Sequence, residues 1–278
     1  MMNDKLINKD IEKVSVIVDT DDLSQTDATQ SRSTSGNANF DYKIKFDENG
    51  FGGVFNNVIG FRLKKAIIRN NPVLINGDNS TIQINSGGVV KRLNPTKYGF
   101  YTGASWATLL SGSTWDEDGD EDYTTALGSV GTVSYDTSTN KLSYTSEQFD
   151  FRTHKESARL LGFNPGSNPV AGTISAFPID LSNHYVDVVV PEIPSIACKR
   201  TASGKNVVER IPMTASAGAT QYFICDPADL QSNNYFYPMK LSEITIQLYT
   251  DNNNLLSATN EQSSFEFEIT ILKNNTFR

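Results

Sequence analysis

The chain has 278 residues, of which 38% are hydrophobic, and its 32 acidic and 24 basic side chains give a formal charge of −8. This length allows a sizeable core, whereas the acidic balance argues against broad binding to nucleic acid, which requires clustered lysine and arginine. No apolar run is long enough to cross a bilayer, and residues 1–13 do not resemble a secretory signal. We therefore expect a protein retained in a reducing compartment, with Cys198 and Cys225 as free thiols, although a disulfide between them stays open.

The first 37 residues are expected to form an N-terminal arm outside the core. Val14, Val16 and Val18 alternate with other residues over one brief strand, and residues 19–37 are rich in Ser, Thr, Asp, Gln and Gly. A segment of this composition cannot bury enough apolar surface to fold alone. The arm is expected either to be disordered or to become ordered against a neighbour.

Residues 38–278 are expected to form one domain that begins with strands. Phe40, Tyr42, Ile44 and Phe46 alternate with charged residues, which is the period of a half-buried strand. A second strand is expected over 57–68, and the apolar phase shifts there at Ala66, which predicts a bulge or bend. Further short strands are expected over 73–75 and 81–85.

A helix–hairpin–helix region over residues 96–163 is expected to be an insertion into this body. The first helix is expected within 97–112, where Trp106 belongs to a small apolar stripe at helical spacing, with Thr102 or Ser105 as its cap. The hairpin has arms at 133–135 and 142–144. The second helix is expected over 155–161, with Gly162 at the position that ends a helix.

The remainder of the chain is expected to consist of strands again. The nearly continuous apolar run over 185–190 predicts a central strand that ends at Pro191. Later strands are expected over 207–213, 221–225, 235–239, 244–249 and 265–271, with a turn at 252–254, where asparagine tolerates positive φ. Roughly eight to eleven short strands separated by turn-rich connections favour an all-β antiparallel sandwich or barrel.

The titratable residues do not form a catalytic or metal-binding pattern. His154 and His184 are the only histidines, and neither has a second ligand at metal spacing. The acidic run 116–122 lacks the glycine and glutamate positions of an EF-hand loop, which favours a solvated, self-repelling segment. Glu266 and Glu268 share the polar face of a predicted strand and are expected to face solvent. We therefore expect no enzyme activity, no catalytic residue, no metal site and no cofactor.

Four segments together resemble the penton and small capsid proteins of large double-stranded DNA viruses and virophages. They are TVSYDTSTNKLSYTSEQFDF (132–151), ESARLLGF (156–163), HYVDVVVPEI (184–193) and the closing segment 235–271 with its alternating final strands. The resemblance covers about residues 96–271. Its most specific parts are the Leu-Leu-Gly-Phe helix end after a hairpin and the pair of closing strands. The final turn is rich in asparagine where Asp-Gly would be typical, and asparagine can adopt the same backbone.

The resemblance implies a single jelly roll, that is, two four-stranded antiparallel sheets packed face to face. It further implies a penton that closes the five-fold vertices of an icosahedral virion as a homopentamer, assembled in the host cytoplasm or a viral factory. The expected partners are other copies of the chain, the neighbouring major capsid protein and minor capsid proteins. Direct contact with nucleic acid is not expected, and any contact with an inner membrane or core is expected to be weak.

Two alternatives remain open from the sequence. One is a minor capsid protein that cements coat subunits. The other is a jelly-roll module that binds a receptor or carbohydrate, for which Trp115 and Trp106 flanking the acidic run offer exposed aromatic candidates, although Trp106 fits the helix stripe better. Lys199 and Arg200 form the densest basic spot nearby, and two charges are too few for a nucleic-acid groove.

Overall fold

The computed structural model describes most of the chain, in ranges separated by gaps. The described residues are 11–20, 40–46, 52–71, 73–75, 82–86, 89–93, 99–112, 115–117, 133–144, 148–149, 151–152, 155–167, 170–171, 174–216, 218–226, 235–251, 253–256 and 263–273. They divide into two compact units, of which the first contains residues 1–70 and 183–278 and the second contains residues 71–182. Among the described residues, no helix is both long and apolar enough to span a membrane.

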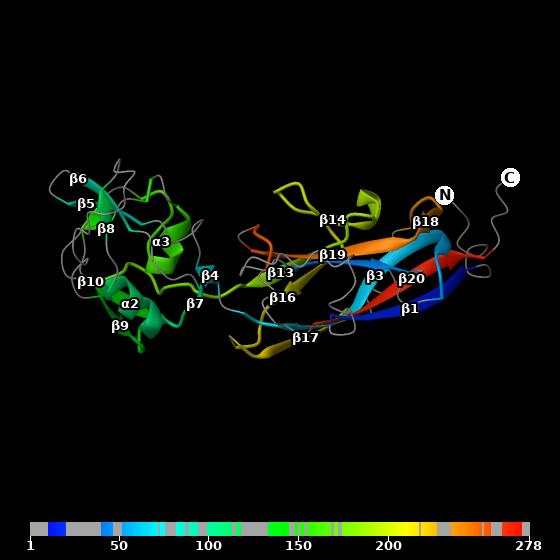
Figure 1. Ribbon diagram of the computed structural model, residues 1–278, viewed down its shortest axis with the longest axis horizontal. Helices are drawn as coiled ribbons and strands as arrows, with labels where there is room; N and C mark the ends of the chain where they lie inside the picture. Colours follow the sequence, from blue (N-terminus) through cyan, green and yellow to red (C-terminus); the bar gives the residue numbers. More distant parts are fainter. Residues whose placement is uncertain are drawn as a thin grey trace. The chain divides into compact units, whose positions relative to one another are not determined.

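The first unit contains two large antiparallel sheets (Figure 1). The first sheet contains, in spatial order, β1 (Ile11–Asp19), β20 (Ser264–Leu272), β3 (Phe55–Arg69) and β17 (Thr220–Ile224), and β18 (Met239–Leu241) also pairs with β3. The second sheet contains β16 (Glu209–Pro212), β13 (Tyr185–Val189), β19 (Glu243–Thr250) and β2 (Asp41–Lys45). If the strands along these two paths are lettered B to I in chain order, the sheets read B-I-D-G and C-H-E-F. This order is that of a jelly roll, so the expected single jelly roll is confirmed.

The two sheets share one apolar core because their strands place apolar side chains on the two faces that meet. Phe265 and Phe267 on β20 are fully buried, and their rings meet Phe40 at 5.8 Å and Phe61 at 5.0 Å. The second sheet contributes inward side chains such as Ile246 on β19. Burying each side chain of this size stabilises the fold by about 1.5–3 kcal/mol, so the shared core holds the two sheets together.

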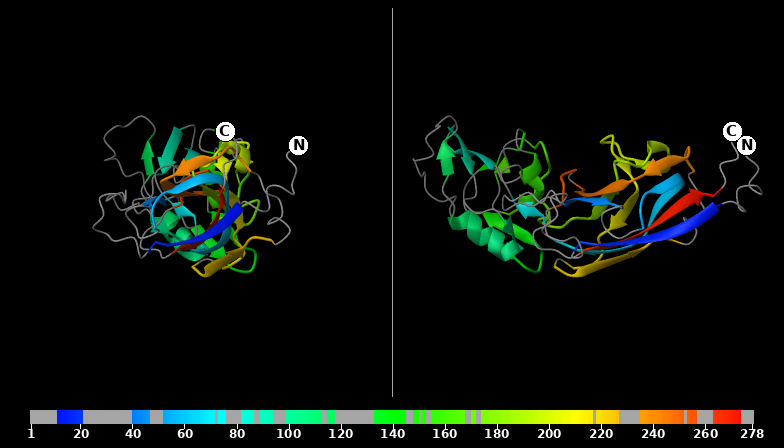
Figure 2. Two further views of the ribbon diagram at one scale, coloured as in Figure 1. Left: turned by 90° about the vertical axis from the view of Figure 1, so that its right-hand side faces the viewer. Right: turned by 45° about the vertical axis from the view of Figure 1, so that its right-hand side comes forward.

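Strand β1 belongs to the jelly roll, although the sequence placed it in an arm. It pairs with β20 along its whole length, from Ile11 opposite Leu272 to Asp19 opposite Ser264, and Figure 2 shows the two strands side by side. Val16 and Val18 are buried in the shared core. Without β1, the edge of β20 would be open and these valines exposed. The expected arm is thus corrected for residues 11–20, and its remaining residues, 1–10 and 21–37, lie outside the described ranges.

Strand β3 contains the irregularity that the shift of apolar phase predicted. Glu266 on β20 lies opposite Lys65, whereas the next residue, Phe267, lies opposite Leu63, so Lys64 is an extra residue in β3. Such a bulge moves the inward face from odd to even positions. Leu63 and Ala66, on either side of it, are consequently both buried.

The second unit contains the expected helices and hairpin together with short strands. Its helices are α2 (Gly103–Gly112) and α3 (Glu156–Leu161), and its hairpin pairs β9 (Val133–Asp136) with β10 (Lys141–Tyr144). The other strands are β4 (Leu74–Ile75), β5 (Ile82–Ser86), β6 (Val89–Leu93), β7 (Gly99–Phe100), β8 (Trp115–Glu117), β11 (Gln148–Phe149) and β12 (Val170–Ala171). The insertion is therefore wider than the expected 96–163. The physical reason is that Val73 and Ile75, expected in the sandwich, are buried in the core of this second unit.

In the second unit, the structure confirms what the sequence predicted for the buried face of the first helix, its cap and the end of the second helix. Trp106 is fully buried on α2 and its Nε1 donates a 2.9 Å hydrogen bond to the carbonyl of Leu160, which confirms the helix-stripe interpretation. Thr102 and Ser105 exchange backbone-to-hydroxyl hydrogen bonds of 2.9 and 3.3 Å at the start of α2, which satisfies N–H groups that have no partner within the helix. Gly162 ends α3 with φ of 76°, a left-handed conformation that favours glycine.

Candidate functional site

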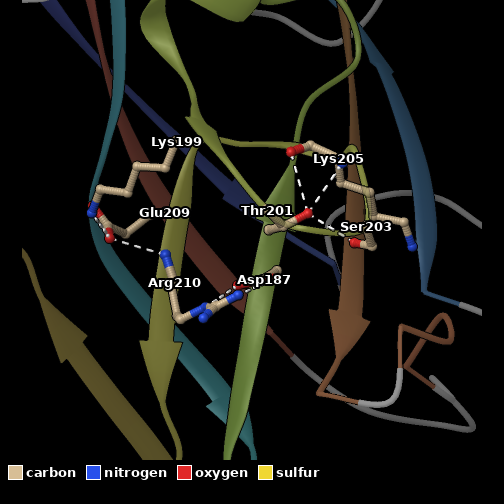
Figure 3. Close-up of polar contacts among 7 residues, drawn as sticks. All are labelled: Asp187, Lys199, Thr201, Ser203, Lys205, Glu209 and Arg210. Carbon is tan, nitrogen blue, oxygen red and sulfur yellow. Dashed lines mark hydrogen bonds and ion pairs between the residues drawn. The ribbon is translucent and has the colours of Figure 1, made fainter.

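A cluster of charged side chains occupies the outer face of the second sheet. Tyr185 and Asp187 point outward from β13 because they alternate with the buried Val186 and Val188. The antiparallel register places Arg210 of β16 directly opposite Asp187. Two strands therefore bring a carboxylate and a guanidinium together (Figure 3), and the phenol ring of Tyr185 lies beside the guanidinium.

Asp187 and Arg210 form a two-point ion pair. Arg210 donates from Nε to Oδ1 at 2.7 Å and from Nη2 to Oδ2 at 2.8 Å, and its guanidinium carbon lies 3.8 Å from the ring centroid of Tyr185. The hydrogen bonds to Asp187 raise the pKa of Arg210 above its ordinary value. The planar guanidinium is thereby fixed in one orientation.

A short hairpin lies beside this ion pair. The hairpin follows the helical turn η1 (Ser195–Ala197) and pairs β14 (Lys199–Arg200) with β15 (Asn206–Val207). Its turn is closed by the hydroxyl of Thr201, which accepts from the backbone N–H of Lys205 at 3.1 Å and lies 2.8 Å from the hydroxyl of Ser203 (Figure 3). The turn therefore has a defined conformation rather than depending on a neighbour.

Two lysines hold the hairpin against the sheet. Lys199 pairs with the carboxylate of Glu209 on β16. Lys205 lies 3.1 Å from the ring centroid of Tyr249 on β19 and donates a 3.1 Å hydrogen bond to the carbonyl of Asn253. Burial lowers the pKa of Lys205 and raises that of Tyr249. These contacts join the hairpin to strands on both sides of β13.

A cavity of about 490 Å³ lies between the hairpin and the outer face of the second sheet. Its lining comes from β13, the hairpin, β16 and the turn after β19, and consists of Tyr185, Asp187, Lys199, Arg200, Thr201, Ala202, Ser203, Val207, Arg210, Thr250, Asp251 and Asn253. A cavity of this size is in the range that accommodates small molecules. Charged, amide and hydroxyl groups converge on it, so it is the candidate functional site.

In this site the acidic side chains lie beneath the basic side chains with which they pair. The side chain of Asp187 is 8% exposed against 43% for its partner Arg210, and that of Glu209 is 13% exposed against 60% for its partner Lys199. The carboxylates are thus covered while the basic groups face solvent. Arg200, which the sequence analysis paired with Lys199 as a basic spot, is exposed and adds a further cation to the same rim.

The remaining residues that the sequence singled out do not join this site as ligands or catalysts. His184 is exposed, and its backbone N–H donates a 3.4 Å hydrogen bond to Asp251, whereas His154 lies outside the described ranges. Cys198 is half-buried and Cys225 is buried, both are free thiols, and burial raises the pKa of Cys198.

The acidic run is described only in part. Its first two residues, 116–117, belong to β8, and residues 118–122 lie outside the described ranges. Within the part of the chain that the structure describes, no three His, Cys, Asp or Glu side chains gather as they would around a metal ion.

Glu266 and Glu268 lie on the outer face of the first sheet as expected, but their carboxylates are largely covered rather than exposed to solvent. Glu266 pairs with Lys64 at 2.8 Å and with Lys65 at 2.9 Å, and Glu268, which is buried, pairs with Arg62. The hydrogen bonds from the two lysines lower the pKa of Glu266 to about 2. The expectation of solvent-facing carboxylates is corrected, because neighbouring basic side chains on β3 fold over them.

An exposed apolar group follows the far edge of the first sheet. Tyr222 and Ile224 on β17 are 69% and 72% exposed, and Tyr222 lies opposite Ile67 of β3, which is also exposed. Strand β17 is at the end of its sheet, and the outer edge of its backbone has no strand partner within the described ranges. We call Ile67, Tyr222 and Ile224 the β17 edge patch.

Comparison with known proteins finds a likeness in structure but none in sequence. The chain matches no family model and no curated protein by sequence. Among solved structures, a crystal structure of the selenomethionine-labelled mavirus penton protein matches with a TM-score of 0.47 and 8% sequence identity, over 94% of this chain and 99% of that chain. The class that the fold itself defines is a jelly-roll β-sandwich with a second unit inserted between its third and fourth strands.

Proposed function

We propose that the chain is a structural protein of an icosahedral virion, namely the penton that closes five-fold vertices as a homopentamer. The feature that carries the proposal is the β17 edge patch, because it joins exposed apolar side chains to an unpaired strand edge on a jelly roll. Exposed apolar groups beside an open strand edge favour aggregation unless a partner covers them. A shell subunit is covered in this way by its neighbours.

The sandwich supports ring closure by contacts between two different surfaces of successive copies. A patch on one copy that meets a different surface on the next generates a closed ring when the rotation between copies divides the circle. Covering Tyr222 and Ile224 would contribute about 1.5–3 kcal/mol for each side chain at each contact. The contact repeats around the ring, so a modest interface is sufficient.

Other partners follow from the same role. The outer surfaces of the ring would meet the neighbouring major capsid protein, and its inner side would meet minor capsid proteins. Residues 1–10 and 21–37 keep their proposed role as arm segments that become ordered against such neighbours. The protein would then be located in the virion.

Native mass measurement and negative-stain imaging of the purified full chain test the proposal. We expect five-fold rings with five times the 30.6 kDa mass of the chain. Ile224→Lys should dissociate the rings, because it places a charge in the apolar contact. Ile196→Lys is the matched control, since Ile196 is 68% exposed and lies on η1, away from the β17 edge patch. Rings of another symmetry, or rings that survive Ile224→Lys unchanged, would contradict the proposal.

The alternative role as a cementing minor capsid protein gives a different outcome in the same measurement. A cement protein would stay monomeric alone and associate only with preformed coat subunits. A monomer at all concentrations tested would therefore favour that alternative over the penton.

A further inference from the structure

The cavity beside the β14–β15 hairpin presents basic groups whose hydrogen-bonding capacity is only partly used. The side chain of Arg200 is exposed and has no hydrogen-bond or ion-pair partner among the residues that the structure describes. A guanidinium has five N–H donors, and Arg210 uses its Nε and Nη2 groups for Asp187. Donors of both arginines therefore remain for an anionic group from solution, although the whole chain is acidic.

The carboxylate of Asp187 does not repel such an anion as strongly as an exposed carboxylate would. Its side chain is 8% exposed and lies beneath the guanidinium of Arg210. Glu209 is covered in the same way by Lys199. An anion that approaches from solvent meets the outer basic layer first.

The rest of the lining consists of groups that recognise hydroxyls. Ser203 contributes a hydroxyl and Asn253 a side-chain amide, and both residues are exposed. Asp251 also lines the cavity, but its Oδ1 atom is buried and its Oδ2 atom accepts the backbone N–H of His184, and Tyr185 contributes part of an aromatic ring. The lining therefore contains both donors and acceptors, as a ring with several hydroxyl groups requires.

We propose that this cavity binds an acidic sugar, whose carboxylate pairs with Arg200 and the outer edge of Arg210 while its hydroxyls bond to Ser203 and Asn253. The volume of about 490 Å³ suits one or two sugar rings. The proposal does not depend on ring assembly, so it can hold or fail independently of the penton function.

An acidic peptide segment is the main competing occupant, because it shares the carboxylate chemistry. The observations favour the sugar for two reasons. Asp251 in the lining would repel the successive carboxylates of an acidic run, whereas a sugar presents one carboxylate and several neutral hydroxyls. A cavity of about 490 Å³ with several neutral polar groups also offers an extended acidic segment few partners beyond the basic side chains.

The test is a ligand-observed NMR titration of the full chain with glucuronic acid and with glucose, which differ in one carboxylate. N-Acetylneuraminic acid serves as a second acidic sugar, inorganic sulfate as a free anion, and a peptide of residues 113–123 of this chain as the acidic segment. We expect dissociation constants on the order of 1 mM for at least one acidic sugar and at least about ten-fold weaker binding of glucose.

Substitutions of Arg200 test whether the acidic sugar binds in this cavity. Arg200→Ser should weaken acidic-sugar binding about ten-fold or more, and Arg200→Lys should retain part of it, since lysine keeps the charge but not the two-point geometry. Lys240→Ser is the matched control, because Lys240 is an exposed cation on β18 outside the cavity lining. It should leave binding unchanged. Arg200 makes no contact that the fold requires, so these variants should fold.

Several results would overturn the proposal. Equal binding of glucose and glucuronic acid would show that the carboxylate is not recognised. Sulfate binding as tight as the acidic sugars would show an anion site only, and tighter binding of the peptide would assign the cavity to an acidic segment. The proposal would also be contradicted if no acidic sugar bound at about 20 mM, or if Arg200→Ser left acidic-sugar binding unchanged.

Discussion

Truncation of the inward valines of β1 tests whether this strand is part of the jelly roll or an arm beside it. Val16 and Val18 are 3% and 2% exposed, whereas Ile17 between them is 57% exposed. Each Val→Ala change removes two methyl groups, at about 0.8 kcal/mol each, and leaves a small cavity in a close-packed core. We expect Val16→Ala and Val18→Ala each to lower the free energy of unfolding by about 2 kcal/mol. Ile17→Ala, which removes more atoms, should lower it by less than about 1 kcal/mol.

The assay is urea unfolding followed by far-ultraviolet circular dichroism. Trp106 and Trp115, the only tryptophans, both lie in the second unit, so tryptophan emission reports that unit instead of the jelly roll. The double variant Val16→Ala/Val18→Ala should lose somewhat less than the sum of the single losses, because the two side chains share neighbours. Equal losses for Ile17→Ala and Val18→Ala, or no loss for either valine variant, would refute the placement of β1 in the sheet.

Three further predictions concern individual contacts. Trp106→Phe should lower the stability of the second unit by about 1–3 kcal/mol, measured by urea unfolding, because it leaves the buried carbonyl of Leu160 without its donor. Gly162→Ala should destabilise the same unit by more than about 1 kcal/mol in that assay, since φ is +76° and a Cβ would lie 2.2 Å from the carbonyl oxygen of Phe177. Glu266 has its pKa lowered from 4.5 to about 2, so its ion pairs stabilise the fold fully above about pH 4.5 and lose this contribution as the pH falls towards 2. Glu266→Gln should therefore flatten the acid limb of a plot of unfolding free energy against pH, and an unchanged acid limb would contradict the assigned ion pairs.

Local alternation was sufficient to find most strands of the sandwich. Strands occur where the sequence alternates, over 40–46, 244–249 and 265–271, and where it is almost continuously apolar, over 185–190. In each case the residues of the strand show which of its faces are buried. The turn at 252–254 likewise contains Asn253 with φ of 65°, as its composition predicted. These features are encoded within a few residues and need no knowledge of partners.

Which core a strand joins is not encoded locally. Val73 and Ile75 alternate as the sandwich strands do, yet they lie in the core of the second unit. Val16 and Val18 precede a polar segment, which suggested an arm, and only the open edge of β20 explains why they are buried. Both differences arise because strand pairing joins residues far apart in the chain.

The candidate site was found in the sequence only in fragments. Lys199 and Arg200 were noted as a basic spot, but Asp187 and Arg210 were not connected, since they lie 23 residues apart. A signal was present, because Asp187 interrupts an otherwise apolar strand. A carboxylate buried in such a strand requires a basic partner, which antiparallel pairing supplied from β16.

The location of the chain within a virus particle tests the central claim most directly. Electron cryo-microscopy of purified particles, with an antibody fragment bound to the chain, would show where it lies. The penton proposal predicts density for a jelly roll and label at the five-fold vertices only. Label distributed over the facets, or absent from the particle, would contradict it.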